Sequence, residues 1–192
     1  ISPEIRAFCA EHDPVLLGTG AAVLRGGVDL YGIDMTLDLV ERLRDRHPRL
    51  GCLWSLIEIV GSSPEYADQL RAEVARRGLG ASWLFTPPQK IFYPVYELVD
   101  LLVRPTLSDG DALSIREALS LGLPVLASDS APRPEETIVF RSRDQENYEQ
   151  RARQTLQQLE SVRQRLAHRP ADSAVQAEVD LLRVALEGDP SG

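Results

Sequence analysis

The sequence predicts an α/β domain with a doubly wound parallel sheet and a C-terminal helical extension. Short apolar segments of strand length alternate with longer segments whose apolar residues recur at helical spacing. Several of the apolar segments end at glycine, serine or proline, which is typical of a strand that passes into a loop. Because strands and helices that alternate at these lengths form right-handed βαβ units, we expect a parallel sheet with helices on both faces.

The composition is that of a soluble globular domain. Of the 192 residues, 43% are hydrophobic and 26% are charged, and no apolar segment approaches the roughly 20 residues that cross a bilayer. The formal net charge of −8 argues against nucleic-acid binding, because proteins bind that polyanion largely through Lys and Arg. The chain begins at Ile1 without methionine, so we interpret it as a fragment or a processed product. We divide it into a lead-in helix over 1–13, a ligand-binding domain over 14–143 and C-terminal helices over 144–192.

The first thirty residues predict one helix and one strand that opens into a long loop. Ser2 is a suitable N-cap and Pro3 a suitable first helical residue, so the lead-in helix begins there and ends before Asp13. Residues 15–17 form a short apolar strand, and the glycines over 18–27 predict the loop that follows it.

Further strands and helices follow in alternation. The helices are indicated by an apolar stripe on one side and by glycine or proline at their ends. The segment 91–99 is either a short helix or a turn. We expect strands at 53–60, 82–85, 101–103 and 124–127, and helices at 33–47, 65–77 and 112–121.

The composition changes after Arg143. Residues 144–160 are rich in Gln, Glu and Arg, so we expect a solvated helix there rather than a core element. The last helix carries an apolar stripe that needs a partner surface, either on this domain or on a domain that the chain lacks. The residues of that stripe are Val175, Val179, Leu181, Leu182 and Leu186.

Ligands of an open parallel sheet bind beyond the carboxyl ends of the strands, where loops and helix N-termini meet. The densest group of polar residues at such an end lies in the segment 104–119. In it, Asp109 and Asp111 precede a helix whose first turn offers backbone N–H groups and a partial positive charge to an anion such as a diphosphate. The alternative is that one of these aspartates is only the N-cap of that helix.

The segment 104–129 also resembles the donor-binding domain of the family 4 retaining glycosyltransferases, which have the GT-B fold. Seven residues separate Asp109 from Glu117, which is the spacing of the family's Glu-x7-Glu signature, and a Gly-x-Pro-Val segment begins at Gly122. The resemblance implies a Rossmann-like half-domain that binds a nucleotide-diphosphate sugar for retaining transfer to an acceptor hydroxyl, in polysaccharide or glycoconjugate synthesis. A bacterial polysaccharide-synthesis subgroup is similar in four short motifs, at 29–32, 109–111, 114–117 and 128–135.

The resemblance assigns roles to residues of the site. Glu117 would accept hydrogen bonds from the ribose hydroxyls, as a fixed carboxylate can, and Asp109 would contact hydroxyls of the donor sugar. Backbone amides over 110–113 would hold the diphosphate, while the backbone at Leu84 and Phe85 would meet the base. The candidate catalytic residues are Asp109 and Arg25, and the candidate substrate-binding residues are Gly20, Leu84, Phe85, Gly110, Asp111, Ala112, Leu113, Ser114, Arg116, Glu117 and Arg133.

Two departures from the family pattern bear on catalysis. Tyr31 stands where the family has the lysine of a Lys-Gly pair, which neutralises the leaving diphosphate together with an arginine. Charge that develops on a leaving group needs a donor or a cation. Arg25, Arg116 and Arg133 are the candidates, although each is equally well explained as a surface arginine. The other departure is Asp109 in place of the first Glu, which shortens the side chain by one methylene and could alter the sugar preference.

No cofactor or metal is expected, because the nucleotide-diphosphate sugar is itself the donor substrate. Cys9 and Cys52 lack the spacing of a metal or redox motif, and the three histidines are expected at the surface. The expected partner is an N-terminal acceptor-binding domain that is missing from this chain. We expect a cytoplasmic protein, with the missing domain as the route to any peripheral contact with the inner membrane.

The sequence also allows two alternatives to a glycosyltransferase. A nicotinamide-linked reductase is disfavoured, because Gly18-Thr19-Gly20 is not followed by the third glycine of the dinucleotide fingerprint and Glu58 lies within the second expected strand instead of at its end. A non-catalytic module that binds a nucleotide sugar, or only a partner protein, stays open because the lysine is missing and a fold alone does not determine function.

Overall fold

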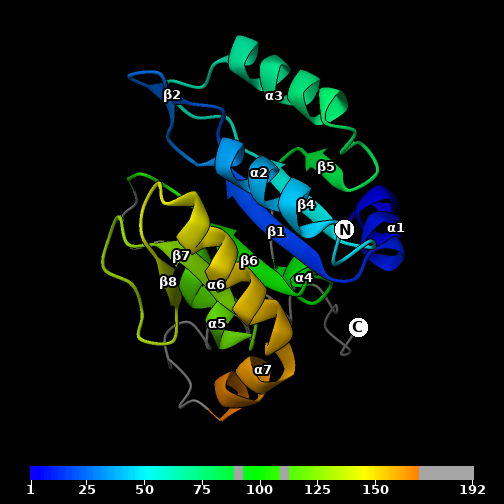
Figure 1. The fold of residues 1–192 in the computed structure, drawn as a ribbon, viewed down its shortest axis with the longest axis vertical. Helices are drawn as coiled ribbons and strands as arrows, with labels where there is room; N and C mark the ends of the chain where they lie inside the picture. The colour runs from blue at the N-terminus through cyan, green and yellow to red at the C-terminus, as the bar shows by residue number, and fades with distance from the viewer. Residues whose placement is uncertain (89–92, 109–112, 169–192) are drawn as a thin grey trace, which may run out of the picture.

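The computed structural model describes residues 1–88, 93–108 and 113–168. These residues form an α/β domain whose six-stranded parallel sheet has helices on both faces (Figure 1), as the sequence predicts. Two parts of the sequence analysis lie outside the described residues: the segment 109–112 of the candidate site, and the last helix with its apolar stripe.

The elements follow the expected alternation. The strands of the main sheet are β1 (Val15–Gly20), β4 (Gly51–Leu56), β5 (Trp83–Thr86), β6 (Leu101–Arg104), β7 (Val125–Ser128) and β8 (Ile138–Phe140). A separate hairpin consists of β2 (Leu24–Arg25) and β3 (Val28–Asp29). The helices of the described chain are α1 (Pro3–Glu11), α2 (Ile33–Leu43), α3 (Pro64–Arg76), α4 (Tyr93–Tyr96), α5 (Leu113–Ser120), α6 (Gln145–Gln157) and α7 (Leu159–Ala167).

The strand order is β5-β4-β1-β6-β7-β8, with every pair parallel. Gly18 of β1 lies opposite both Trp54 of β4 and Val103 of β6. The chain moves outward from β1 through β4 to β5, then crosses back to β6 on the other side of β1 and moves outward again to β8. The direction of winding therefore reverses between β1 and β6, where open α/β sheets bind their ligands.

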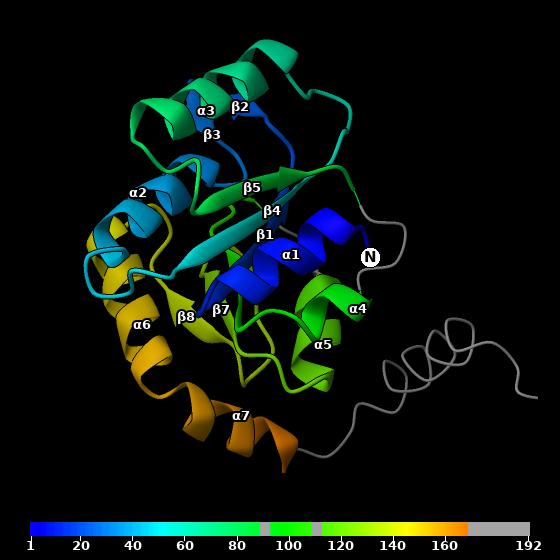
Figure 2. The same cartoon turned by 90° about the vertical axis from the view of Figure 1, so that its right-hand side faces the viewer.

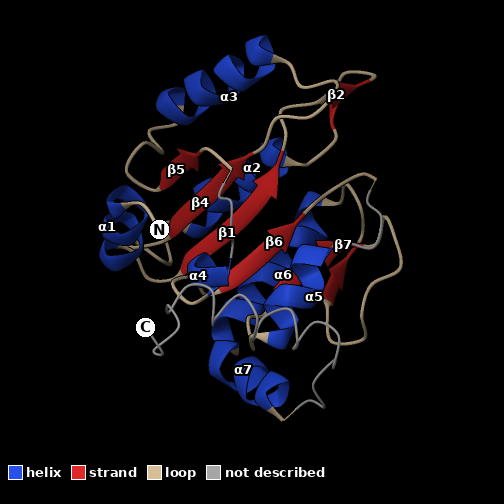
Figure 3. Ribbon diagram, turned by 180° about the vertical axis from the view of Figure 1, so that it is seen from behind, coloured by secondary structure: helices blue, strands red, loops and turns tan. Residues whose placement is uncertain are grey.

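Each face of the sheet has its own apolar core, because successive side chains of a strand point to opposite faces. One core, with Leu16 and Trp54, lies under α2, α3 and α6. The other core, with Leu17 and Leu53, lies under α1, α4, α5 and α7. Figure 2 shows α2 and α6 on one side of the strands and α1, α4 and α5 on the other, and Figure 3 shows the second face from behind.

Two strands differ from their predicted extents by three residues or more. β1 continues through Gly20, so Gly18 to Gly20 belong to the strand and not to a loop. Gly18 is needed there because the ring of Trp54 lies against it, and an added Cβ would be 2.1 Å from Trp54 Cε3. β4 ends at Leu56 rather than at Val60, and the fully exposed Val60 side chain belongs to the loop that leads to α3.

The hairpin and β8 were not predicted. The hairpin turns at Gly26 and Gly27, whose φ values of +60° and +79° suit the two-residue turn that matches the twist of paired strands. β8 has only three residues, Ile138–Phe140, and none of the signals that indicate a strand from sequence alone is strong over so short a segment.

The prediction of a solvated helix after Arg143 was wrong for α6. Tyr148, Ala152 and Thr155 are buried, and the Tyr148 ring stacks on Phe140 of β8 with centroids 4.3 Å apart. Their spacing of four and then three residues is helical, but only Tyr148 is a large apolar residue, so the stripe was too narrow to stand out among the charges. α6 therefore contributes to the core that covers one face of the sheet.

Candidate functional site

The carboxyl ends of the parallel strands lie along one edge of the sheet, which we call the carboxyl edge. Most of the candidate residues were predicted to follow these strand ends. The residues at the ends are Gly20, Leu56, Thr86, Arg104, Ser128 and Phe140.

A buried arginine lies on the carboxyl edge where the winding reverses. Arg104, at the end of β6, is 8% exposed, and its Nη1 donates a hydrogen bond to the backbone oxygen of Thr19 on β1, 3.1 Å away. The sequence analysis missed this residue because it treated Arg104 as the start of a loop. The available signal was a charged residue directly after the apolar segment 101–103, at the carboxyl end of an expected strand. A cation withdrawn from water in this position makes the edge electrostatically favourable for an anion.

A second arginine is held at the end of the neighbouring strand. Arg133 Nε donates to the backbone oxygen of Ser128, 2.9 Å away, and its Nη2 lies 3.3 Å from Ser130 Oγ. The Ser128 hydroxyl in turn donates to the backbone oxygen of Thr106, at 2.6 Å. Arg133 is thus on the carboxyl edge, as predicted, and the loops after β6 and β7 are joined there.

Glu117 lies on α5, which follows the loop after β6. Its Oε2 accepts a hydrogen bond from the Tyr96 hydroxyl, 3.0 Å away. Burial, followed by the negative charge of Glu117, raises the pKa of Tyr96, so the phenol remains protonated and donates to the carboxylate. Glu117 itself is half-buried.

The first turn of α5 carries three other candidate residues. Leu113 is 49% exposed, Ser114 and Arg116 are half-buried, and the Arg116 backbone oxygen accepts a hydrogen bond from the Ser120 hydroxyl. The structure therefore places all of the described candidates from 113 to 117 within about the first turn and a half of α5. Asp109, Gly110, Asp111 and Ala112 lie outside the described residues, so their roles stay predictions.

Gly20 and the departure at Tyr31 are structurally linked. An added Cβ at Gly20 would lie 2.4 Å from Tyr31 Cδ1, so the absence of a side chain at Gly20 makes room for the tyrosine ring. Gly32 has a φ of +70°, and an added Cβ there would be 2.3 Å from the backbone oxygen of Pro105. The segment before α2 is therefore packed closely against the loop after β6. The Tyr31 ring, at the position where the resemblance to family 4 implies a lysine, therefore lies against Gly20.

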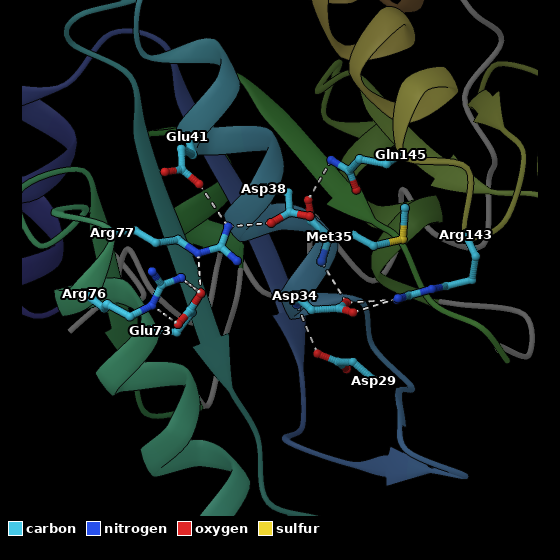
Figure 4. Close-up of polar contacts among 10 residues, drawn as sticks. All are labelled: Asp29, Asp34, Met35, Asp38, Glu41, Glu73, Arg76, Arg77, Arg143 and Gln145. Atoms are coloured by element: carbon cyan, nitrogen blue, oxygen red, sulfur yellow. Dashed lines mark hydrogen bonds and ion pairs between the residues drawn. The ribbon is translucent and has the colours of Figure 1, made fainter.

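Asp29 closes the N-terminus of α2. Its Oδ1 accepts hydrogen bonds from the N–H groups of Tyr31 and Gly32, and its Oδ2 accepts from the Asp34 N–H and the Tyr66 hydroxyl. Burial raises the pKa of Asp29, and the hydrogen bond from Tyr66 acts in the opposite direction. Figure 4 shows Asp29 beside Asp34, which forms an ion pair with Arg143. Because a carboxylate already occupies this helix terminus, a diphosphate would be repelled from it, which favours α5 as the anion site.

A second polar cluster in Figure 4 joins α2 to α3. Arg77 forms ion pairs with Asp38 and Glu41 of α2, and its Nε lies 2.6 Å from Glu73 Oε1. Hydrogen bonds from Arg76 and then from Arg77 lower the pKa of Glu73 to about 2. This cluster ties two helices together and contains none of the candidate site residues.

A cleft lies at the carboxyl ends of β4 and β5. It has a volume of about 520 Å³, and a smaller cleft of about 360 Å³ shares Leu56, Glu58 and Arg71 with it. Phe85 lines the larger cleft, whereas the Leu84 side chain packs against the core on the other face. The residues that line the larger cleft are Leu56, Glu58, Arg71, Phe85, Thr86, Pro87 and Pro88.

The prediction that Glu58 lies within the second strand is wrong. Glu58 lies beyond the end of β4 and not within the strand, because β4 ends at Leu56. An acidic residue after the second strand is where dinucleotide-binding folds place a ribose contact. The other premise against a reductase is unchanged, since β1 runs through Gly20 and the glycine fingerprint is incomplete.

Arg25 lies in the hairpin, which projects beyond the end of the sheet beside α3 (Figure 1). The side chain is exposed, and it forms no hydrogen bond or ion pair with any residue that the structure describes. A catalytic role for Arg25 thus stays a prediction.

Residues 1–88, 93–108 and 113–168 contain neither a metal-binding cluster nor a membrane-spanning helix. No group of three or more His, Cys, Asp or Glu side chains there could hold a metal ion. No helix in the same ranges is long and apolar enough to cross a bilayer.

Comparison with known proteins identifies a family. The family model described as Glycosyl transferases group 1 matches residues 21–158, which is well over half of the chain. No curated protein matches the chain significantly.

Several solved structures have the same fold. A glycosyltransferase from Rickettsia africae ESF-5 has a TM-score of 0.69 at 13% identity, over 98% of this chain and 54% of that one. Anabaena Alr3699/HepE, in complex with UDP and glucose, has a TM-score of 0.69 at 13% identity, over 96% of this chain and 53% of that one. The C-terminal domain of the group 1 family protein LpcC from Francisella tularensis has a TM-score of 0.65 at 14% identity, over 86% of both chains.

These likenesses show that the domain has the fold of a GT-B half-domain. The chain spans about half the length of the Rickettsia and Anabaena proteins, but it agrees in extent with the isolated C-terminal domain from Francisella.

Proposed function

Because this chain belongs to the glycosyltransferase group 1 family, we propose that it is the donor-binding half of a retaining family 4 glycosyltransferase. In this proposal a nucleoside diphosphate sugar binds at the carboxyl edge, where the winding of the sheet reverses. The observation that carries the proposal is the Glu117 carboxylate, which a tyrosine hydroxyl holds on the first turns of α5. The spacing between Asp109 and Glu117 supports the assignment to family 4 and hence to retention.

The donor would lie across the edge from α5 toward β4 and β5. Glu117 accepts hydrogen bonds from the ribose hydroxyls. The N–H groups of the first turn of α5 donate hydrogen bonds to the diphosphate. The base lies toward the cleft beside Phe85 and Thr86, whose volume of about 520 Å³ suits part of a small ligand. The solved structures with UDP bound, from Anabaena and from the pneumococcal O-GlcNAc transferase GtfA, support uridine as the first nucleoside to test.

Arginine would supply the charge that the missing lysine does not. Arg104 and Arg133 are both fixed on the carboxyl edge by hydrogen bonds to backbone oxygens, at 3.1 and 2.9 Å. Their positive charge offsets the negative charge that develops on the leaving diphosphate, without reorganisation at the moment of reaction. Asp109 contacts the donor sugar in this proposal, as the resemblance implies.

The acceptor side would come from a second domain. The match to only about half of the full-length structures supports this part of the proposal. Closure of two domains excludes water and positions the acceptor hydroxyl, so the isolated chain should bind the donor weakly and turn over negligibly. We place the complete enzyme in the cytoplasm, with any contact with the inner membrane made through that second domain.

One observation favours a second function. The Tyr31 ring covers Gly20 at the position where the family has its lysine, so a leaving-group contact is replaced by packing. A module that binds a nucleotide sugar, or only a partner protein, without catalysis fits that change.

Isothermal titration calorimetry on the 192-residue chain tests the proposal, with UDP, GDP, ADP and NADPH as ligands. We expect a nucleoside diphosphate to bind, and Glu117→Gln to weaken its binding by about 1.5–3 kcal/mol, because the charged acceptor is lost while the shape is kept. Glu97→Gln is the matched control, since Glu97 also accepts a tyrosine hydroxyl, from Tyr93 at 2.9 Å, and is exposed.

Each outcome points to a different function. If none of the diphosphates binds, the partner-binding module is favoured, and if only NADPH binds, the reductase is. If Glu117→Gln binds as tightly as the unmodified chain, Glu117 does not belong to the site.

A further inference from the structure

We propose that Tyr96 is a positioning residue that orients the Glu117 carboxylate toward the ribose of the donor nucleotide. This inference rests on the proposed function and adds a residue that the sequence analysis did not select. It concerns α4, which contributes no other residue to the site.

The direction of the hydrogen bond follows from the distances. Among the residues that the structure describes, Glu117 Oε2 lies 3.0 Å from the Tyr96 hydroxyl and the Ser114 backbone oxygen lies 3.5 Å from it. The second distance is too long for a good O–H···O bond. A bond to an ionised acceptor is also stronger than one to a neutral carbonyl. Of these two acceptors, the carboxylate is the one that receives the phenol proton.

The tyrosine is itself held rigidly. Tyr96 is 4% exposed, and its ring belongs to the apolar core that also contains Val99, Ile115 and Ala118. Burial raises the pKa of the phenol, so the hydroxyl stays a donor throughout the range in which proteins are handled. A rigid donor removes rotational freedom from Glu117, whose side chain otherwise has three rotatable bonds.

The carboxylate keeps acceptor capacity for a ligand. Among the residues that the structure describes, Tyr96 is the hydrogen-bond partner of the Glu117 side chain, and it uses Oε2. An ionised carboxylate has about four lone-pair sites, so Oε1 and the second site on Oε2 can accept the two adjacent hydroxyls of a ribose. To accept hydrogen bonds from two adjacent hydroxyls at once, the carboxylate must have a fixed orientation. To accept one hydrogen bond, it need not.

The test compares two ligands in two variants by calorimetry: UDP and 2′,3′-dideoxy-UDP, with Tyr96→Phe and Tyr93→Phe. The phenylalanine ring keeps the packing and removes only the hydroxyl. Tyr93 is the matched control, because it lies on the same helix and donates to a different glutamate, Glu97, at 2.9 Å. We expect the unmodified chain and Tyr93→Phe to prefer UDP over the dideoxy ligand by about 10- to 100-fold.

In Tyr96→Phe we expect this preference to fall by about 3- to 10-fold, with the affinity for dideoxy-UDP unchanged. If Tyr96 served only in folding, Tyr96→Phe would weaken the binding of both ligands equally. Equal weakening therefore overturns the proposal. An unchanged preference for UDP over the dideoxy ligand overturns it too. If Tyr96→Phe does not fold, Tyr96→4-aminophenylalanine keeps the ring and a weaker donor; we then expect a smaller fall in the preference, and equal weakening of the binding of both ligands would overturn the proposal. If the unmodified chain does not bind UDP, the uridine donor of the proposed function is wrong, and the same comparison is made with the nucleoside diphosphate that does bind and its dideoxy analogue. If the unmodified chain binds both ligands equally, the ribose role of Glu117 fails instead.

Discussion

Gly18→Ala is expected to destabilise the centre of the sheet. An added Cβ at Gly18 would lie 2.1 and 2.3 Å from two atoms of the Trp54 ring, against 3.4–4 Å for an ordinary contact. The ring would have to retreat by more than about 1 Å, and overpacking of this kind costs about 1–3 kcal/mol, occasionally more. Trp54 is fully buried and stacks on Trp83 with centroids 6.0 Å apart, so it has little room to move. We therefore expect the free energy of unfolding to fall by about 3 kcal/mol.

Equilibrium unfolding in urea, followed by far-UV circular dichroism, measures this change. Gly80→Ala is the matched control, since an added Cβ at Gly80 meets nothing within 4 Å, and its cost should stay within about 0.5 kcal/mol. In a double-mutant cycle, Trp54→Phe should relieve part of the clash, so that the double variant is more stable than additivity predicts by about 1 kcal/mol or more. Full additivity, or a cost for Gly18→Ala no larger than that of Gly80→Ala, would refute the close-packing argument.

Two further predictions concern the helices. Tyr148→Ala should lower the free energy of unfolding by about 3–5 kcal/mol, because it removes a fully buried ring stacked on Phe140, whereas Gln150→Ala on the exposed side of α6 should cost about 0.5 kcal/mol or less. Equal costs in thermal or urea denaturation would contradict the place of α6 in the core. The cluster around Arg77 predicts a pH dependence: the pKa of Glu73 is lowered from 4.5 to about 2 in the folded chain, so its stabilising effect is complete above pH 4.5 and is lost as the pH falls toward 2. Glu73→Gln should therefore lose less stability than the unmodified chain between those pH values, and identical pH profiles would show that the ion pairs do not act on stability.

The alternation of strands and helices could be predicted because each element carries its own local signal. Ser2 and Ser63 cap α1 and α3 with their side chains, and prolines open both helices, so the starts of these elements follow from a few residues. The parallel sheet follows from that order, since a strand joined to the next through a helix returns in the same direction.

The extents of several elements depend on contacts between distant residues. Gly18 and Gly20 indicate a loop when taken alone, yet both lie in β1 because the rings of Trp54 and Tyr31 occupy the space beside them. α6 has the composition of a solvated helix, and the positions of β8 and α2 against it make Tyr148 a core residue.

In the candidate site, too, some features follow from the sequence and others depend on contacts between distant residues. Sequence by itself determined the class of fold and made the carboxyl edge and Glu117 candidates for the site, because those depend on element order and on a motif of fixed spacing. Tertiary structure alone decided that Arg104 is buried beside Thr19 and that Tyr96 holds Glu117. Tyr96 and Glu117 are 21 residues apart, and Arg104 and Thr19 are 85 apart. The physical reason is that hydrogen bonds act over about 3 Å in space whatever the separation along the chain, so partners at such separations leave no local pattern in the sequence.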